Sequence, residues 1–361
     1  MKILKTVKEI LNQEPPLLVG VDISNSSIKA MELMKDNNQY SIQAYGNVML
    51  PPNAVVDKNI KDVKVVADAL STLLNSSKFS TQNVAVALSG ASVITRVIQI
   101  DANLKENEIL DQISLEADRY IPYPLEEVNL DFQILGPSKK NSQLMDVMLA
   151  AARIETIDAY LEALNMAGLK VKIVEVESFS LERAFSLITD KLPNQGVNQR
   201  IALLDIGGAT TTLSVFHNQD VIYNRDQGFG GRQLTEEIQR RYSLSIKEAL
   251  AAQKLGGLPE EYVTEVLEPF RETVAQQINR ALEFYYSSEQ HGELDYIALV
   301  GGTASIPDLD EAVYQRTTIK TIVANPISEM LIGSNVKSDL IINDGPSLML
   351  CCGLAMRSFD K

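Results

Sequence analysis

The sequence predicts an α/β fold with two related halves and an α+β block inserted into the first half. Three observations lead to this prediction. A strand–turn–strand stretch with an aspartate near the end of its first strand occurs twice, at 18–33 and 201–216. The region 84–175 between them has its own series of strands and helices, and a buried strand at 295–300 runs into a pair of glycines. A repeat of this length indicates two related halves that face each other.

The chain begins with a short basic amphipathic segment, residues 1–14. Five aliphatic residues share one helical face and three lysines lie off it: Ile3, Leu4, Val7, Ile10, Leu11, and Lys2, Lys5, Lys8. The segment lacks the continuous apolar core and cleavage site of a signal peptide. Because so short a helix is marginal alone, we expect a docking or frayed helix; rest on an anionic membrane surface is the alternative.

The first hairpin, LVGVDISNSSIKAMEL, follows Pro15 and Pro16. Backbone N–H groups and hydroxyls in such a turn can hold phosphate oxygens, and an aspartate at a strand end can hold a hydrated magnesium ion. A third strand is expected at 40–50, and a helix at 62–76 that covers one sheet face. The candidate nucleotide-binding residues are Asp22, Ser24, Asn25, Ser26 and Lys29, although Lys29 is equally compatible with a surface position.

The block at 84–175 contains expected strands at 84–88, 93–100, 128–135, 144–151 and 171–174, with helices at 105–120 and 155–167. Its most unusual string is YIPYPL, residues 120–125. Two prolines restrict the backbone and two tyrosines offer flat amphipathic area, a composition that suits a recognition surface. Tyr120, Pro122 and Tyr123 are therefore candidate partner-binding residues. The alternative is a rigid helix-to-strand connection with half-buried tyrosines.

The second hairpin, IALLDIGGATTTLSVF, follows an expected helix at 176–189. Its paired glycines allow a sharp turn or a close approach of a ligand to the backbone. The candidate nucleotide-binding residues are Asp205, Gly207, Gly208, Thr210 and Thr211. Taken alone, an Asp-x-Gly-Gly turn also joins strands in proteins that bind nothing; the presence of a second copy favours a nucleotide site.

The rest of the second half begins with a third strand at 220–225. Helices are expected at 233–241, at 245–255 with Ser245 as N-cap, and at 260–290 with a kink or break at Pro269. The strand 295–300 then leads to Gly301 and Gly302 and to a helix from 306 or 307. Such a turn can hold a ligand against backbone and helix N-terminus, with Ser305 nearby, although a bare Gly-Gly turn is also common. A last helix is expected at 346–358.

The composition limits the class of protein. With 361 residues, 45% hydrophobic and 22% charged, the chain is an ordinary globular protein, and its net charge of −14 argues against nucleic acid as main partner. The two cysteines, Cys351 and Cys352, are adjacent and make no disulfide framework, which favours a reducing compartment. No apolar run reaches the roughly 18 residues of a membrane span. His217 and His291 show no metal-ligand spacing.

The order of these parts resembles the superfamily of ATP-binding proteins that includes actin, the heat-shock ATPase chaperones and the sugar kinases. By this resemblance five segments match two phosphate loops, an adenosine motif and two connecting helices: 22–29, 205–212, 299–307, 176–184 and 345–356. The resemblance implies an actin-like ATPase fold around a nucleotide cleft. It also implies ATP and Mg²⁺ as cofactors, with Asp22 and Asp205 holding the metal through water.

The resemblance also implies subdomain boundaries, written 1A, 1C, 2A and 2B. Subdomain 1A takes 15–83, 176–197 and 344–361, and the insertion, at the place used by the division protein FtsA, is 1C at 84–175. Subdomain 2A takes 198–230 and 295–343, and the helical 2B takes 231–294.

Closer still, VDISNSSIK, RYIPYPLEEVNLDFQILG, VESFSLERAF and CCGLAMRSF resemble the PilM family of type IV pilus inner-membrane assembly proteins over nearly the whole chain. This resemblance implies a cytoplasmic ATP-binding protein of pilus biogenesis and twitching motility. Such a protein grips the N-terminal tail of PilN in a groove between 1A and 1C, meets other platform proteins, and contacts the inner membrane only through PilN. Self-association is compatible with it.

Some positions depart from the superfamily pattern. Ser24 stands where many members have glycine and Ser26 where many have threonine, yet both offer a hydroxyl. Glu177 falls where superfamily hydrolases place the residue that orients the attacking water. It is the candidate catalytic residue of an at most slow ATPase; a solvated or hydrogen-bonded carboxylate is the alternative.

Two other functions fit the superfamily. An FtsA-like filament-forming cell-division ATPase is expected to carry a C-terminal linker and an amphipathic membrane helix, and this sequence shows neither before Lys361. A metabolic kinase is expected to carry an aspartate base beside a sugar pocket, and no such motif is found. Because a shared fold does not settle function, only the PilM-like strings favour the pilus role.

Overall fold

A computed structural model describes residues 16–37, 39–115, 119–138, 141–288, 292–337, 341–342 and 344–360. The chain divides into two compact units. Unit 1 comprises residues 1–180, 332–336 and 353–361, and unit 2 comprises residues 181–331 and 337–352. The predicted amphipathic segment at 1–14 lies outside the described residues.

Unit 1 is built around a six-stranded sheet. Its spatial order is β10 (Lys170–Val176), β6 (Asn83–Leu88), β1 (Val19–Ile23), β2 (Ser27–Asp36), β3 (Gln39–Met49) and β16 (Leu331–Ile332). The first hairpin makes β1, β2 and β3 antiparallel, whereas β6 and β10 run parallel to β1 after helical crossovers. The carboxyl end of β1 therefore lies beside the carboxyl ends of β6 and β10.

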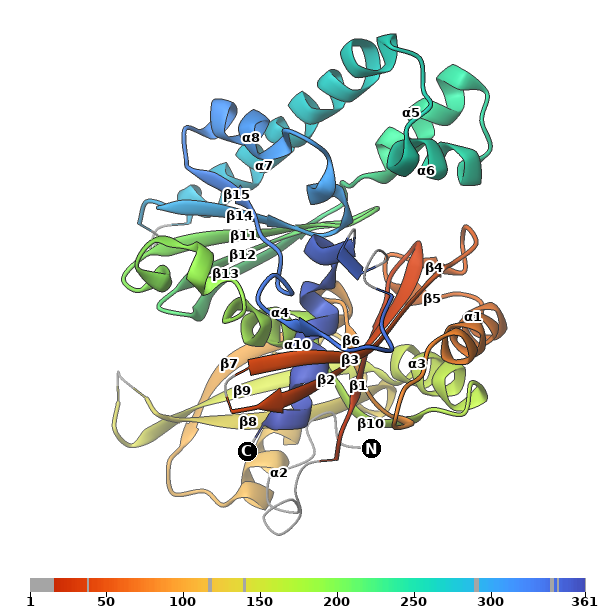
Figure 1. Cartoon of the computed structure of the whole chain (residues 1–361). Helices are drawn as coiled ribbons and strands as arrows, with labels where there is room; N and C mark the ends of the chain where they lie inside the picture. Colours follow the sequence, from red (N-terminus) through yellow and green to blue (C-terminus); the bar gives the residue numbers. More distant parts are fainter. Residues whose placement is uncertain are drawn as a thin grey trace. The chain divides into compact units, whose positions relative to one another are not determined.

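Two helices cover one face of this sheet, α1 (Val63–Ser76) and α3 (Ile154–Met166), and Figure 1 shows them side by side. Helix α1 buries aliphatic residues at helical spacing, such as Val66, Leu70 and Leu73, against the sheet. Each such side chain contributes about 1.5–3 kcal/mol when fully buried. The Asp62 side chain caps the helix by accepting the Val65 N–H at 3.0 Å.

A separate three-stranded sheet in unit 1 has the order β7 (Val93–Asp101), β9 (Leu144–Arg153), β8 (Val128–Pro137). Helix α2 (Glu106–Leu115) packs on one of its faces, and the two share a core (Figure 1). The predicted insertion at 84–175 covers more of the chain than this sheet and its helix, because β6, β10 and α3 within that range pack with the six-stranded sheet. Periodicity identifies a buried strand but does not say which sheet it joins.

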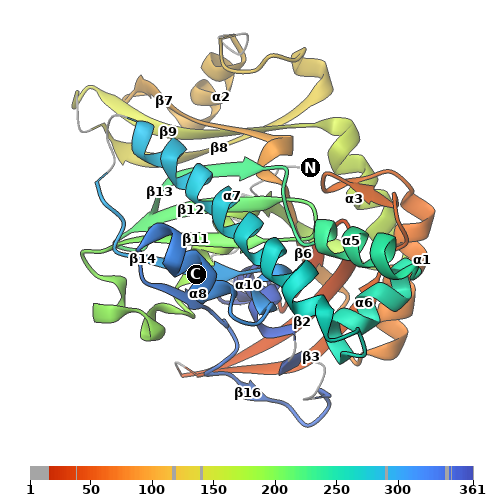
Figure 2. The same cartoon turned by 90° about the horizontal axis from the view of Figure 1, so that it is seen from above.

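Unit 2 contains a five-stranded sheet with the order β13 (Asp220–Gln227), β12 (Thr211–His217), β11 (Arg200–Ile206), β14 (Tyr296–Val300) and β15 (Thr321–Val323). The second hairpin makes β11 and β12 antiparallel, while β14 runs parallel to β11. The long helix α7 (Glu268–Ser287) crosses this sheet in Figure 2, and residues such as Ile278 and Tyr285 share its core.

The other helices of unit 2 include α5 (Arg232–Tyr242), α6 (Ile246–Leu255) and α8 (Leu309–Thr317). Ser245 caps α6 as predicted, in a reciprocal capping box with Glu248. At the kink or break predicted near Pro269, a π-helical turn at Val263–Leu267 runs directly into α7, so the helix is locally irregular there without a break. Helix α8 begins later than predicted, since a 3₁₀ turn (Gly302–Ser305) starts at the second glycine of the pair.

The chain passes between the units within α4 (Glu177–Phe185), on either side of residues 332–336, and again within α10 (Met349–Met356). The sequence-based prediction differs, because it assigned all of 176–197 and 344–361 to the first half. In unit 1 the start of α4 and the end of α10 pack so closely that a Cβ on Gly353 would overlap the Ser180 carbonyl oxygen. Among the described residues, none of the helices is both long and apolar enough to cross a membrane.

Candidate functional site

The turn of the first hairpin is held by its own polar groups. The Ser24 N–H and hydroxyl both donate to the Ser27 carbonyl, each at 2.9 Å. The Asn25 side-chain oxygen accepts the Lys58 N–H at 2.8 Å, and the Ser26 carbonyl accepts the Leu50 N–H at 2.8 Å. The Ser26 side chain stays exposed at the tip. Two of the three predicted loop side chains therefore shape the turn, and the third faces solvent.

Asp22 and Lys29 lie opposite each other across the same hairpin. They are register partners in β1 and β2, and their charged atoms are 3.8 Å apart. Both side chains are largely buried. Lys29 therefore lies on the Asp22 side of the sheet rather than at a remote surface position.

Glu177 lies at the first residue of α4 and is also buried. Its carboxylate accepts a hydrogen bond from the Lys58 ammonium at 2.6 Å. The Tyr160 hydroxyl donates to the Lys58 carbonyl oxygen at 2.8 Å, and burial together with the Glu177 carboxylate raises the pKa of Tyr160 well above its usual range. Sequence reasoning missed Lys58 and Tyr160, because neither belongs to a recognisable motif.

The turn of the second hairpin is held by backbone contacts from two other segments of unit 2. The Gly207 carbonyl accepts the Gly231 N–H at 3.0 Å and the Thr303 hydroxyl at 2.9 Å. The Gly208 carbonyl accepts the Arg232 N–H at 2.7 Å, at the start of α5. Sequence reasoning missed this second glycine turn, although the run Gly228–Phe229–Gly230–Gly231 before a helix could have signalled it.

Three glycines at this place have no room for a side chain. A Cβ on Gly230 would overlap the Gly207 carbonyl, and one on Gly231 would overlap the Thr303 hydroxyl. Gly301 has φ +90°, and a Cβ there would lie 2.5 Å from the Ile206 carbonyl oxygen and closer still to the Asp205 carboxylate. These glycines allow backbone turns to pack directly on one another.

The remaining predicted residues of unit 2 divide into inward and outward groups. The Thr211 hydroxyl is buried and donates to the Phe229 carbonyl at 2.8 Å. Thr210 is half-buried, and its carbonyl oxygen accepts the Gly207 N–H at 2.9 Å. Gly208, Gly302 and Ser305 are exposed, and nothing lies within 4 Å of a Cβ on Gly302.

These turns meet at one edge of the five-stranded sheet. Asp205 pairs in register with Val300 of β14 and Thr212 of β12, so the hairpin and the glycine pair adjoin at the carboxyl ends of β11 and β14. Ligands of α/β sheets bind at such ends. Close-packed turns with exposed backbone beside a carboxylate fit a nucleotide phosphate with its metal ion.

Among the described residues, no three His, Cys, Asp or Glu side chains lie together in a cluster that could hold a metal ion. The His217 ring lies 3.2 Å from the Gln199 carbonyl oxygen, and His291 lies outside the described residues. Asp22 and Asp205, the predicted magnesium residues, belong to units 1 and 2 respectively.

The string at 120–125 belongs to the three-stranded sheet and its helix. Tyr120 packs against the core of that sheet, whereas Pro122 and Tyr123 point outward. Tyr123 is 40% exposed, and the Arg153 guanidinium lies 5.4 Å from its ring centroid. Part of the string is therefore a buried connection, and Pro122 and Tyr123 remain accessible.

The sheet face opposite α2 offers a second accessible surface. Along β7, Val93 on this face is buried in the core of the six-stranded sheet. Val97, four residues further on the same face, is 53% exposed. Side chains on this face of β7 therefore change from buried to solvent-exposed within one strand.

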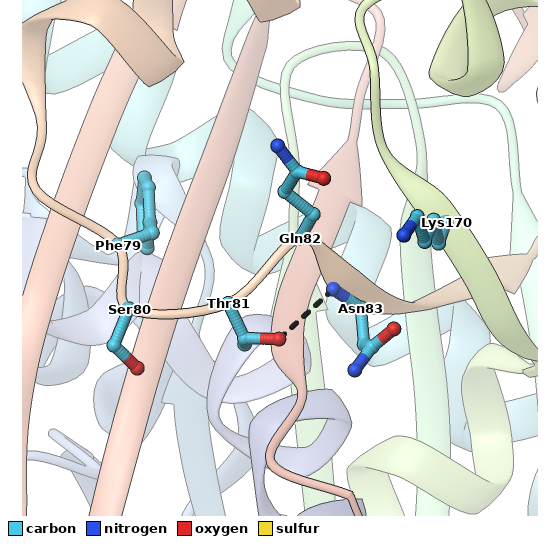
Figure 3. A pocket seen from close by; sticks show the side chains of 6 residues that line it. All are labelled: Phe79, Ser80, Thr81, Gln82, Asn83 and Lys170. Atoms are coloured by element: carbon cyan, nitrogen blue, oxygen red, sulfur yellow. Dashed lines mark hydrogen bonds between the residues drawn. The ribbon is translucent and has the colours of Figure 1, made fainter.

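A shallow hollow in unit 1 lies away from these residues. Figure 3 shows the six residues that line it, Phe79 to Asn83 and Lys170, with the Asn83 N–H donating to the Thr81 hydroxyl at 3.1 Å. The register pairs Val84 with Val19, so the hollow lies at the amino ends of β1, β6 and β10. The first hairpin turn is at their opposite, carboxyl ends.

Comparison with known structures establishes the fold. A structure described as the "PilM-PilN type IV pilus biogenesis complex" matches with TM-score 0.79 and 24% identity, over 96% of this chain and 100% of that chain. The ethanolamine utilization protein EutJ from Carboxydothermus hydrogenoformans matches at TM-score 0.52 and 17% identity, over 97% and 93%. MreB5 of Spiroplasma citri bound to ADP matches at 0.50 and 13%, over 96% of each chain. The predicted actin-like ATPase fold is confirmed.

Comparison of sequences identifies the family. The cell division protein FtsA of Bacillus subtilis (strain 168) is 22% identical over 260 residues, which are 66% of this chain and 57% of FtsA, so the match spans little more than half of that relative. The family model of the type IV pilus assembly protein PilM matches residues 20–359. This chain therefore belongs to the PilM family of type IV pilus assembly proteins.

Proposed function

We propose that this protein is a cytoplasmic ATP-binding assembly protein of the type IV pilus inner-membrane platform, and that it grips the N-terminal tail of PilN. The family match over residues 20–359 carries the proposal. The related structure described as a PilM–PilN complex supports PilN as partner, and the ADP bound by MreB5 supports a nucleotide as cofactor.

The nucleotide site of the proposal uses both hairpins. The Asp22 and Asp205 carboxylates would hold Mg²⁺ through water, because each is the last but one residue of its strand and precedes a turn whose N–H groups and hydroxyls can hold phosphate. The phosphates would meet the turns, and the adenosine would meet the exposed glycine turn; the residues are Ser24, Asn25, Ser26, Lys29, Gly207, Gly208, Thr210, Thr211, Gly301, Gly302 and Ser305. Bound ATP would supply a terminal phosphoryl group that water can attack.

Glu177 is the proposed residue that orients this water. Its position supports the role in one respect: the Lys58 ammonium at 2.6 Å holds the carboxylate in one place. The same ion pair keeps Glu177 partly occupied, which agrees with an ATPase that is slow at most. Glu177→Gln should keep nucleotide affinity and lower any hydrolysis rate.

The partner site of the proposal lies between the six-stranded sheet and the three-stranded sheet of unit 1. Its walls would be the accessible end of β7 around Val97 and the outward turn at Pro122 and Tyr123, with the half-buried Tyr120 behind it. An apolar peptide tail would bury this exposed surface. Membrane contact would then come indirectly, through PilN at the cytoplasmic face of the inner membrane.

The test is a calorimetric titration of the protein with a synthetic PilN N-terminal peptide, with and without ATP and magnesium. Saturable one-to-one binding is expected, and its affinity should change with nucleotide. Tyr123→Ala and Val97→Asp should weaken binding if both surfaces are walls of the site. Absence of binding in both states would refute the adaptor function.

An FtsA-like filament function is the alternative, and the FtsA match favours it over other members of the superfamily. It predicts nucleotide-dependent polymerisation, which sedimentation and light scattering would detect. Polymerisation without peptide binding would favour the filament function, whereas peptide binding by a monomeric protein would exclude it.

A further inference from the structure

A small hairpin in unit 1 occupies an unusual position. Its strands are β4 (Val55–Val56) and β5 (Asn59–Ile60), and its two-residue turn is Asp57–Lys58. Both turn residues have positive φ, +49° and +58°. Asparagine and glycine are the residues that favour such a turn, so a lysine is held there by its surroundings rather than by preference.

Lys58 contacts three separate parts of unit 1. Its N–H donates to the Asn25 side chain in the first hairpin turn at 2.8 Å, and its carbonyl accepts the Tyr160 hydroxyl of α3 at 2.8 Å. Its ammonium lies 2.6 Å from the Glu177 carboxylate of α4. One residue thus joins the proposed phosphate turn, the proposed catalytic glutamate and α3.

The hairpin also contacts both chain connections of the three-stranded sheet. The chain enters that sheet through a 3₁₀ turn (Gly90–Ser92), where the Ser92 hydroxyl donates to the Asn59 side chain at 3.3 Å. It leaves through Arg153 directly into α3, which carries Tyr160. A displacement of the Asp57–Lys58 turn would therefore act on the entry and the exit of the sheet together.

The charges around Lys58 make the turn sensitive to an added anion. The Lys58 side chain is 16% exposed and that of Glu177 is 9% exposed, so water and salt screen this pair weakly. Burial, then the Glu177 carboxylate and to a smaller extent the Asp22 carboxylate raise the pKa of the Tyr160 hydroxyl, so both carboxylates act on this cluster. A polyphosphate at the first turn would compete with Glu177 for the Lys58 ammonium.

We propose that Lys58 is the positioning residue through which nucleotide occupancy at the first hairpin changes the affinity of the three-stranded sheet for its partner peptide. The inference rests on the proposed function, since it requires both ligands. It adds the physical route between them, which starts at the Lys58 ammonium and continues through the Lys58 carbonyl to Tyr160 and, in the same hairpin, through Asn59 to Ser92.

The test compares Lys58→Met with the full-length wild type. Methionine keeps the backbone bonds and the apolar stem but removes the ammonium. Peptide affinity is measured calorimetrically with and without ATP and magnesium, and nucleotide affinity is measured separately with a fluorescent ATP analogue. We expect a wild-type affinity ratio of about fivefold or more between the two states. Lys58→Met should bring the ratio near one while the protein still binds the peptide.

Two further variants separate coupling from a general effect. Lys61→Met, at an exposed lysine just after the same hairpin, should keep the wild-type ratio. Tyr160→Phe removes only the hydroxyl that donates to the Lys58 carbonyl, and it should lower the ratio of peptide affinities. If Lys58→Met does not fold, Tyr160→Phe replaces it in the test.

Equal peptide affinities of the wild type with and without nucleotide would overturn the inference. A wild-type affinity ratio in folded Lys58→Met would also overturn it. If Lys58→Met does not fold, a wild-type ratio in Tyr160→Phe has the same meaning. If the wild type binds no peptide or no nucleotide, the proposed function fails instead, and separate measurement of the two ligands distinguishes these results.

Discussion

Gly301 and Gly302 are equivalent in the sequence, but the structure assigns them different tasks. Gly301 has φ +90°, in a region that residues with a side chain rarely occupy, and an added Cβ would lie 2.5 Å from the Ile206 carbonyl oxygen. Because that oxygen belongs to the backbone of β11, it cannot rotate away. Gly302 has open space around a Cβ and no positive φ.

The cost of Gly301→Ala follows from these two terms. The backbone conformation contributes roughly 1–3 kcal/mol and the overpacking roughly 1–3 kcal/mol, so the free energy of unfolding should fall by about 2–6 kcal/mol. This corresponds to a melting temperature lower by roughly 4 °C or more. Gly302→Ala should change the free energy of unfolding by at most about 0.5 kcal/mol.

The assay is urea and thermal unfolding of both variants, followed by the melting shift with ATP and magnesium. Gly301→Ala should also lose the nucleotide shift, since its methyl group would push against the Asp205 carboxylate. Gly302→Ala separates ligand contact from folding, because a smaller nucleotide shift with unchanged stability assigns this position to the ligand. Equal stability of the two variants would refute the packing argument.

Three further changes test other parts of the molecule. Asp205→Ala should abolish the melting shift with ATP and magnesium. Asp220→Ala, at an exposed aspartate of the same sheet, should keep this shift. A shift that persists in Asp205→Ala would remove Asp205 from the site. Burial and then the Asp220 carboxylate raise the pKa of Glu182, so ionised Glu182 costs stability as the pH rises through its folded pKa. Glu182→Gln should therefore raise the melting temperature at pH 7 and leave it unchanged near pH 4, and an equal effect at both would contradict the burial argument. Tyr123→Ala should weaken PilN peptide binding by roughly tenfold if the peptide buries the Tyr123 ring. Tyr314→Ala, at a ring of similar exposure in unit 2, should leave peptide affinity unchanged. Equal peptide affinities of the two variants would remove Tyr123 from the site.

The sequence predicts local structure well where local chemistry decides it. The Asp62 cap of α1 and the Ser245 capping box of α6 depend on residues three positions apart, and both are visible in the chain. The two hairpins are visible for the same reason, since apolar strands flank a short polar turn.

Contacts between distant residues could not be predicted in this way. Lys58 meets Glu177 across 119 positions and Tyr160 across 102, and no pattern marks a lysine in an ordinary polar turn as their partner. The membership of β6 in the six-stranded sheet has a similar origin, because an apolar strand has the same pattern in either sheet. The glycine turn at Gly230 became informative only when its contact with Gly207 was known.

The way unit 1 is closed has a consequence for its synthesis. The Ser358 hydroxyl accepts the Leu18 N–H at 2.9 Å across 340 positions, and the Arg357 guanidinium lies 3.3 Å from the buried Glu175 carboxylate. On a ribosome, the first sheet must therefore wait for residues 353–360 before the Leu18 N–H gains its acceptor and the Glu175 carboxylate gains its cation. Most of unit 2, a continuous stretch from 181 to 331, is complete before that point. The half of the molecule that is translated first is the half that finishes folding last.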